Sequence, residues 1–191
     1  MNPIICGVDE AGRGPLAGPV VTSAVIFDQT IFIQGVKDSK KLSKNRRESL
    51  FDEILEKCYE YSIVSVDNLT IDDINILNST MLGMEKCLMG INCKKMKIMI
   101  DGNYFVLKNN NHLKYNFETI VKGDDRIFAI SCASILAKVT RDRIMEDFDE
   151  EFPLYNFKNN KGYPTKQHIE QIKKYGITRI HRKSFCKKFL E

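Results

Sequence analysis

Residues 4–19 read Ile-Ile-Cys-Gly-Val-Asp-Glu-Ala-Gly-Arg-Gly-Pro-Leu-Ala-Gly-Pro, and this stretch decides how the rest of the chain is interpreted. Its apolar start predicts a strand that ends in two adjacent carboxylates, Asp9 and Glu10. The glycines on either side of Arg13 let backbone amides approach a ligand closely. Carboxylates bind hard cations, whereas amides and an arginine bind phosphate. The stretch therefore suggests metal-dependent chemistry on a phosphodiester, although a water-facing strand end followed by a tight turn has the same pattern.

The composition is that of an ordinary globular domain. The chain has 191 residues, of which 43% are hydrophobic and 28% charged, which suits one domain with one core. The N-terminus lacks a basic segment followed by an apolar one, so no signal peptide is expected. No apolar run reaches the length of a membrane span. We therefore expect a cytoplasmic protein that does not enter a membrane.

The cysteines and histidines do not form a metal-ligand pattern. Six cysteines are scattered with no Cys-x-x-Cys pair, and three histidines are equally dispersed. This spacing argues against a structural zinc site and against a Cys-His nucleophile. We expect reduced, mostly buried thiols. Their positions are Cys6, Cys58, Cys87, Cys93, Cys132 and Cys186.

Positive charge is concentrated in two segments. The net charge is only +4, but residues 36–47 hold six Lys or Arg against one Asp, and residues 151–191 hold ten against three acidic residues. The remainder of the chain is therefore acidic. An acidic body with two basic segments suits a protein that binds a polyanion and keeps carboxylates for metal, although a solvated surface can be equally uneven.

Hydrophobic periodicity predicts an α/β body over residues 1–150. β-Branched residues bounded by glycine or proline predict strands at 3–8 and 19–27, joined as a hairpin. Ser43 is expected to cap a helix that reaches about residue 59, and Thr70 to begin a second helix through a capping box. The other expected elements are strands at 63–66, 97–100 and 119–121, a helix at 127–150, and polar loops at 37–44 and 109–111.

Residues 151–191 predict a small C-terminal helical extension packed on this body. From Phe152 onward, aromatic and basic residues alternate. Pro164 is expected at the first position of a helix that reaches Tyr175. His181 and Arg182 are expected to anchor the tail. No repeat or flexible linker separates the extension from the body.

Acidic residues follow three of the expected strands. Asp9 and Glu10 end the first strand, and Asp101 and Asp124 follow two later ones, each beside a glycine. Carboxylates at strand ends can converge on one edge of a sheet, as in two-metal sites. Asp142 is an alternative to Asp124 as the fourth ligand, but its place in a helix between two arginines favours a structural ion pair.

Seven blocks of sequence occur in an order that one known family shares. They are Gly-Val-Asp-Glu-Ala-Gly-Arg-Gly-Pro-Leu-Ala-Gly-Pro-Val-Val at 7–21, Asp-Ser-Lys-Lys-Leu at 38–42, Asp-Gly-Asn at 101–103, Lys-Gly-Asp at 122–124, Ser-Cys-Ala-Ser-Ile-Leu-Ala-Lys-Val-Thr-Arg-Asp at 131–142, Lys-Gly-Tyr-Pro-Thr at 161–165 and His-Arg-Lys-Ser-Phe at 181–185. In this order the chain resembles bacterial ribonuclease HII from residue 4 to about 185. Small departures are Cys132, where the family usually has alanine, and the Asn-rich loop.

The resemblance implies an RNase H-like mixed β-sheet flanked by helices, with a C-terminal helical extension. It implies an endonuclease that hydrolyses the RNA strand of RNA–DNA hybrids and incises 5′ of single ribonucleotides embedded in duplex DNA. The family's catalytic and metal-binding carboxylates fall on Asp9, Glu10, Asp101 and Asp124. Its ribonucleotide sensor, a glycine-arginine-glycine backbone with a tyrosine, falls on Gly12, Arg13, Gly14 and Tyr163.

These roles agree with simple chemistry. Two Mg²⁺ or Mn²⁺ ions can activate a water and stabilise the leaving 3′ oxygen, which gives 5′-phosphate and 3′-hydroxyl ends. A ribose 2′-hydroxyl donates and accepts hydrogen bonds, which suits a glycine backbone beside a tyrosine hydroxyl. Further polar residues are expected to contact phosphate, although helix packing or solvent exposure would also explain them. They are Lys40, Lys41, Ser134, Lys138 and Arg141.

Two other functions are compatible with parts of this sequence. Ribonuclease HIII shares the carboxylates but lacks the glycine-arginine-glycine sensor and carries an extra N-terminal domain, so both features favour HII. A non-enzymatic nucleic-acid-binding module would need only the basic segments, and four carboxylates that repel DNA argue against it. The expected partner is an RNA–DNA hybrid or ribonucleotide-containing duplex DNA, bound by a monomer. The tail shows no obvious clamp-binding segment, so sliding-clamp binding is doubtful.

Overall fold

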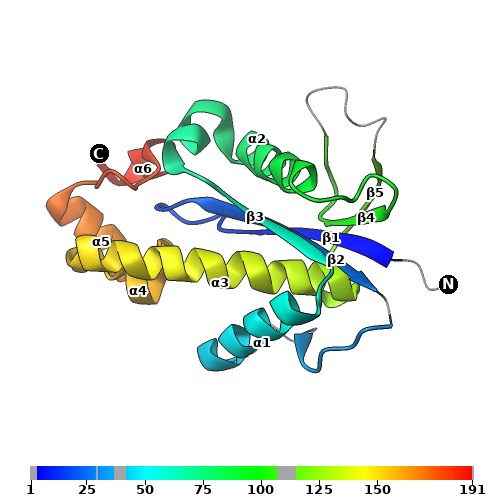
Figure 1. Ribbon diagram of the computed structural model, residues 1–191. Coiled ribbons are helices and arrows are strands. Elements are labelled where there is room, and N and C mark those ends of the chain that lie inside the picture. The colour runs from blue at the N-terminus through cyan, green and yellow to red at the C-terminus, as the bar shows by residue number, and fades with distance from the viewer. Residues whose placement is uncertain (1–3, 29, 37–41, 107–114, 191) are drawn as a thin grey trace.

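A five-stranded mixed sheet forms the centre of the molecule (Figure 1). The computed structural model describes residues 4–28, 30–36, 42–106 and 115–190. The strand order is β3-β2-β1-β4-β5. β2 pairs antiparallel with both β3 and β1, and β4 pairs parallel with both β1 and β5. The strands are β1 (Ile4–Ala11), β2 (Val20–Asp28), β3 (Glu60–Val66), β4 (Lys97–Asp101) and β5 (Asn116–Ile120).

Helices cover both faces of this sheet. Figure 1 shows α2 on one face, α1 and α3 on the other, and the C-terminal helices gathered at one end. This arrangement confirms the fold class expected from the sequence. The helices are α1 (Lys44–Lys57), α2 (Asn68–Met89), α3 (Phe128–Glu151), α4 (Phe157–Asn160), α5 (Lys166–Tyr175) and α6 (Lys183–Leu190), with short 3₁₀ turns η3 (Gly123–Asp125) and η4 (Pro153–Tyr155).

Strand β1 is apolar because both of its faces are buried. Ile5 packs into the core formed with α1 and α3, whereas Cys6 and Val8 pack into the core formed with α2. Gly7 lies where α3 crosses the sheet, and a Cβ at this position would come within 2.2 Å of the Ala129 carbonyl carbon. Only glycine permits this approach, which brings α3 directly over the strand that carries Asp9.

The hairpin and the helix cap at Ser43 are confirmed. β1 and β2 pair in antiparallel register from Ile4 opposite Asp28 to Ala11 opposite Val21. The Ser43 side chain accepts the backbone N–H of Arg46. Both features depend on neighbouring residues alone, so local sequence patterns were sufficient to find them.

Two helix starts were wrong by a few residues. α2 begins at Asn68 rather than at Thr70, because Asp67 caps it by accepting the Thr70 N–H at 2.8 Å. Asp72, in the first turns of α2, accepts the first amides of α6. Pro164 lies before the capping residue Thr165 and is therefore outside α5 rather than at its first position.

The C-terminal extension packs onto the loop between β1 and β2. Leu16 donates its N–H to the Gly162 carbonyl at 2.8 Å, and Gly18 donates to the Ile180 carbonyl at 2.9 Å. Apolar side chains from both parts share one core. α3 continues through Glu151, across the predicted boundary at residue 150, and that boundary stays a prediction.

The cysteines agree with the expectation of reduced thiols. All six are free, five of them are buried, and Cys58 is partly buried. Within the described ranges, no helix is both long and apolar enough to span a bilayer. The predicted loop at 109–111 lies outside the described residues.

Candidate active site

The carboxyl ends of β1, β4 and β5 meet at one edge of the sheet because the three strands are parallel. Val8 of β1 pairs with Ile100 of β4. Asp9 and Asp101 are the next residues of these two adjacent strands, so they lie at the same edge of the sheet. Asp124 lies in η3, a few residues after β5. The structure thus brings the predicted carboxylates to the same edge.

Asp9 is held in a buried, electrically negative position. Its side chain is 4% exposed, and its Oδ1 accepts the Glu10 N–H at 2.7 Å. The pKa of Asp9 is raised well above its usual value by burial first, then by the charges of Glu10 and Asp101, and a hydrogen bond with Ser134 on α3 opposes this. A buried carboxyl whose pKa is raised by burial and by neighbouring carboxyls is typical of functional sites.

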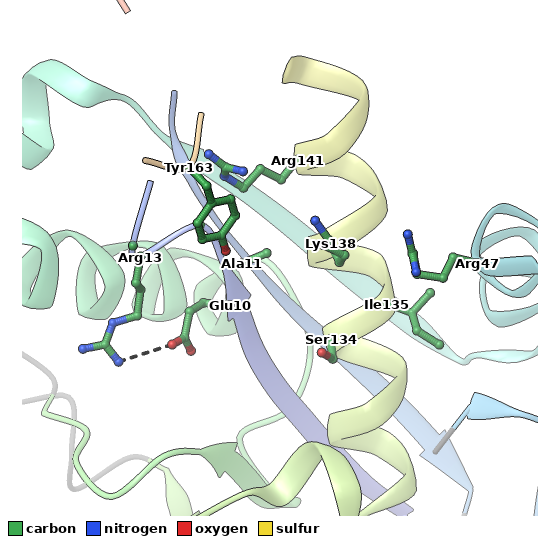
Figure 2. Close-up of a pocket in the computed structure, with 11 residues that line it drawn as sticks. Glu10, Ala11, Arg13, Arg47, Ser134, Ile135, Lys138, Arg141 and Tyr163 are labelled. Carbon is green, nitrogen blue, oxygen red and sulfur yellow. Dashed lines mark hydrogen bonds and ion pairs between the residues drawn. The ribbon is translucent and has the colours of Figure 1, made fainter. Parts of the chain in front are cut away.

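Glu10 interacts with Arg13 and with the charges of the other carboxylates. Burial raises the pKa of Glu10, the neighbouring Arg13 lowers it, and the charges of Asp101 and Asp124 raise it again. Arg13 lies 3.4 Å from the Glu10 carboxylate (Figure 2). Asp9, Asp101 and Asp124 therefore lie close enough to Glu10 for their charges to repel it, and a cation between them would reduce this repulsion.

Local hydrogen bonds fix the other two acids. Asp101 Oδ1 accepts the Gly123 N–H at 2.7 Å, which ties the end of β4 to η3. The Ser131 hydroxyl on α3 donates to the Asp124 carbonyl and to the Ile127 carbonyl. The turn that carries Asp124 is thereby anchored to both the sheet and α3.

The donor set suits a hard divalent cation. Oxygen ligands from several carboxylates are what Mg²⁺ and Mn²⁺ prefer. In the part of the chain that the structure describes, no group of three His, Cys, Asp or Glu side chains is already close enough to hold a metal ion. The fit therefore rests on the oxygen-ligand chemistry of the four acids and on their shared negative charge.

Asp142, the alternative fourth ligand, is engaged elsewhere. It lies on α3 and accepts a hydrogen bond from Lys138 Nζ at 2.6 Å. Arg143, one of the two arginines expected to pair with it, instead forms an ion pair with Glu48 of α1. The ion pair expected from sequence is present, but its partner is Lys138.

A hollow of about 420 Å³ opens beside the carboxylates. We call this space the substrate hollow. Figure 2 shows the Glu10–Arg13 segment on one side of it and α3 on the other. Its charged and polar border residues are Glu10, Arg13, Arg47, Ser134, Lys138, Arg141 and Tyr163.

Arg47 is a border residue that the sequence interpretation missed. It lies on α1 and donates to the Leu42 carbonyl. The signal was available, because Arg47 belongs to the basic segment at 36–47, but nothing local distinguished it from the other cations there. Lys40 and Lys41, the predicted phosphate contacts of that segment, lie outside the described residues.

The glycine loop and Tyr163 lie side by side although 149 residues separate Gly14 from Tyr163. A Cβ on Gly14 would be 3.6 Å from the Tyr163 ring. Tyr163 is 43% exposed, and the Arg141 guanidinium carbon lies 6.0 Å from its ring centroid. An exposed aromatic ring beside a bare backbone can contact a sugar and its base.

Two buried arginines hold the glycine loop from behind. Arg141 donates to the carbonyls of Ala17, Pro19 and Lys161. Arg182 donates to the carbonyls of Gly12, Arg13, Gly18 and Pro19. The loop carbonyls therefore point toward these guanidinium groups.

Arg141 is therefore not the free phosphate contact expected from sequence. It is 1% exposed and its guanidinium donates inward to three carbonyls. Burial lowers its pKa to about 10, so it stays charged at neutral pH. Ser134, another predicted phosphate contact, is hydrogen-bonded to Asp9, and Lys138 is paired with Asp142 at the border of the substrate hollow.

Gly12→Ala is expected to destabilise the fold by more than about 1 kcal/mol. Gly12 has φ +98°, and a Cβ there would lie 2.1 Å from Arg141 Nε and 2.8 Å from the Pro19 carbonyl oxygen. Urea unfolding measures the loss. Gly14→Ala is the matched control, because its Cβ would make only an ordinary contact with Tyr163, and its stability should stay within about 0.5 kcal/mol of the original. Equal losses in both variants would contradict the strain at Gly12.

Comparisons with known proteins agree with this geometry. The family model described as Ribonuclease HII matches residues 6–188. A ribonuclease HII from Caldicellulosiruptor bescii is 48% identical over 186 residues, covering 97% of this chain and 88% of the relative. The crystal structure of ribonuclease H2 from Pyrococcus horikoshii OT3 superposes with a TM-score of 0.80 at 29% identity, covering 97% of this chain and 96% of that one. A PCNA:RNase HII complex from Archaeoglobus fulgidus contains a chain with a TM-score of 0.74 at 25% identity, covering 98% and 95%.

Proposed function

Because the chain belongs to the ribonuclease HII family and is a ribonuclease H, we propose that it incises duplex DNA 5′ of single embedded ribonucleotides as well as the RNA strand of RNA–DNA hybrids. The observation that carries the proposal is the edge of the sheet, where the charges of Asp9, Asp101 and Asp124 act on Glu10, and Glu10 borders a hollow shared with the glycine loop and Tyr163. The arrangement supports a metal site next to a surface that would contact a ribose.

In this proposal Asp9, Glu10, Asp101 and Asp124 hold two Mg²⁺ or Mn²⁺ ions. Bound there, the ions would activate a water and stabilise the departing 3′ oxygen, so the products would carry 5′-phosphate and 3′-hydroxyl ends. Buried and already oriented, Asp9 keeps its position through the Glu10 N–H and Ser134. Such second contacts orient ligands before the ion arrives.

Arg13 has a second task in the proposal. It pairs with Glu10 at 3.4 Å, and half of its side chain is exposed. The exposed part of its guanidinium would contact the phosphate of the scissile strand. Lys138 and Arg47, at the opposite border of the substrate hollow, offer further positive charge to the backbone.

Recognition of the ribonucleotide is assigned to the Gly12–Gly14 backbone and to Tyr163. Their proximity supports the assignment, because a Cβ on Gly14 would already touch the Tyr163 ring. The 2′-hydroxyl needs both a donor and an acceptor, and a bare backbone beside a phenol provides both. Deoxyribose lacks this hydroxyl and so leaves the same groups unpaired.

The partners and the cell compartment are extensions of the same proposal. We place the protein in the cytoplasm as a monomer acting on hybrid or ribonucleotide-containing duplexes. The archaeal relative bound to PCNA shows that one member of this fold meets a sliding clamp. For this chain, doubtful sliding-clamp binding stays a prediction.

Divalent metal is expected both to be required for cleavage and to stabilise the fold. Incubation with a DNA duplex carrying one ribonucleotide should give incision 5′ of it with Mg²⁺ or Mn²⁺ and none with EDTA. An ion that binds only the folded state adds about 2.7 kcal/mol when its concentration is 100 times the dissociation constant, so the melting temperature should rise.

An all-DNA duplex of the same sequence is the control for specificity. Asp9→Asn is the control for the melting shift, which it should largely remove. Metal-independent incision, or an equal melting shift in the control variant, would contradict the metal site.

A further inference from the structure

Two histidines form a buried pair in the C-terminal extension. His168 on α5 is fully buried, and His181, just before α6, is 1% exposed. Their Nε2 atoms lie 3.1 Å apart. Neither ring reaches the carboxylates or the substrate hollow, so the pair has no direct place in the proposed chemistry.

Hydrogen bonds determine which ring nitrogens carry protons. The Thr178 N–H donates to His181 Nδ1 at 2.9 Å, so that nitrogen is an acceptor. The proton of His181 therefore lies on Nε2 and is donated to His168 Nε2. The proton of His168 then lies on Nδ1 and is donated to the Tyr163 carbonyl at 2.9 Å. Burial lowers the pKa of both rings, that of His181 to about 4, so this neutral chain persists at physiological pH.

The chain of hydrogen bonds ends at Tyr163, whose backbone N–H and carbonyl are both hydrogen-bonded. Tyr163 donates its N–H to the Asn160 carbonyl at 2.9 Å, and its carbonyl also accepts the Thr165 N–H at 2.8 Å. The preceding Gly162 lies so close to the Ala17 carbonyl that a Cβ would come within 2.5 Å of it. The exposed phenol is thus mounted on a rigid support.

His181 and its neighbour Arg182 are linked by hydrogen bonds to both parts of the sensor, Tyr163 and the Gly12–Gly14 loop. Through His168, His181 reaches Tyr163. Its own backbone forms a bridge with Ala17 in the loop after the glycines. Arg182 donates to the carbonyls of Gly12 and Arg13. One dipeptide therefore links two elements that are distant in sequence and that must act on the same sugar.

We propose that His168, His181 and Arg182 are positioning residues that set the spacing between Tyr163 and the Gly12–Gly14 loop. They act through the sensor and do not contact substrate. The inference rests on the proposed function of Tyr163 as a ribonucleotide sensor. A displaced phenol would meet the 2′-hydroxyl poorly, and small errors in placement reduce rates steeply.

The test is a double-mutant cycle between His168 and Tyr163. Single-turnover cleavage of a DNA duplex with one ribonucleotide is measured for His168→Leu, Tyr163→Ala and the double variant, well below their melting temperatures. His168→Leu should lower the rate about five- to tenfold. In the Tyr163→Ala background it should have less than about a twofold further effect, because the positioned group is absent.

Rescue by a conservative variant separates positioning from general stability. In His168→Asn the side-chain amide retains a donor where Nδ1–H points at the Tyr163 carbonyl, and most of the rate should return. A rate in His168→Asn as low as in His168→Leu would overturn the proposal. So would equal effects of His168→Leu in both backgrounds.

A measurement without substrate keeps the inference testable if these variants are unstable. The chain has no tryptophan, so Tyr163→Trp introduces a single fluorophore at the sensor. Adding His168→Asn should lower its fluorescence anisotropy less than adding His168→Leu, and unchanged anisotropy in both would overturn the proposal. A normal rate in Tyr163→Ala, in contrast, would remove the sensor itself and with it the proposed function of Tyr163.

Discussion

Asp9→Asn or Asp101→Asn is expected to lower the single-turnover cleavage rate by at least about a thousandfold, or about 4 kcal/mol of transition-state stabilisation. Both residues lie at adjacent parallel strand ends and raise the negative charge that a metal ion would neutralise. Duplex binding should be retained, because the basic segments are unchanged. Rate and binding are measured on the same duplex with one ribonucleotide.

The stability of Asp9→Asn distinguishes lost metal binding from lost folding. Burial and neighbouring charges raise the pKa of Asp9 in the folded state. A carboxyl with a raised pKa binds its proton more tightly when folded, so its ionised form costs stability at neutral pH, and this cost disappears as the pH falls below the unfolded value. Without metal, the variant should therefore melt at the original temperature or higher. A normal rate in a well-folded variant would remove the proposed site.

Asp124→Asn and Asp142→Asn form a matched pair for the fourth ligand. Asp124 affects the pKa of Glu10, whereas Asp142 pairs with Lys138 on the same helix. We expect the larger loss of rate in Asp124→Asn. A larger loss in Asp142→Asn would mean that the fourth ligand has been assigned to the wrong residue.

Tyr163→Ala is expected to reduce cleavage at a lone ribonucleotide by at least about tenfold, because losing a hydrogen bond and a stacking surface costs about 1.4 kcal/mol or more. Its ring borders the substrate hollow beside Gly14 and is 43% exposed, so it is not needed to fill a core. The single-turnover rate and the melting temperature are measured together.

Tyr163→Phe separates the hydroxyl from the ring. If the phenol reads the 2′-hydroxyl, Phe should retain the stacking and lose most of the discrimination between ribose and deoxyribose. The rival explanation is a tyrosine that only packs the extension onto the body. That explanation would gain support if the rate in Tyr163→Ala fell only in proportion to stability.

Several local features could be predicted from the residues alone. Ser43 caps α1 because its side chain and the amide it satisfies are three residues apart. The run from Ile4 to Val8 forms a strand because its residues are apolar on both faces. The start of α2 was misplaced because two possible capping residues, Asp67 and Thr70, lie close together. Asp72 accepts the first amides of α6, which lie more than a hundred residues away.

The roles of some basic residues depend on their burial, which the sequence does not show. Arg141 has the same charge as Lys138, and nothing in the sequence around them shows that the Arg141 guanidinium is buried against loop carbonyls while the Lys138 side chain is partly exposed. Arg47 was overlooked for the same reason among its basic neighbours. Whether a cation meets phosphate or a backbone carbonyl depends on what packs around it.

By itself the sequence determined the strand ends that carry the carboxylates and, through its ordered motifs, the ribonuclease HII family, because these are properties of neighbouring residues and their order. Only the tertiary structure decided that Tyr163 faces Gly14 and that His181 and Arg182 link the two. The contacts of Gly14 with Tyr163 and of Gly12 with Arg182 join residues 149 and 170 positions apart. Chain folding alone creates them, since no local preference acts over that distance.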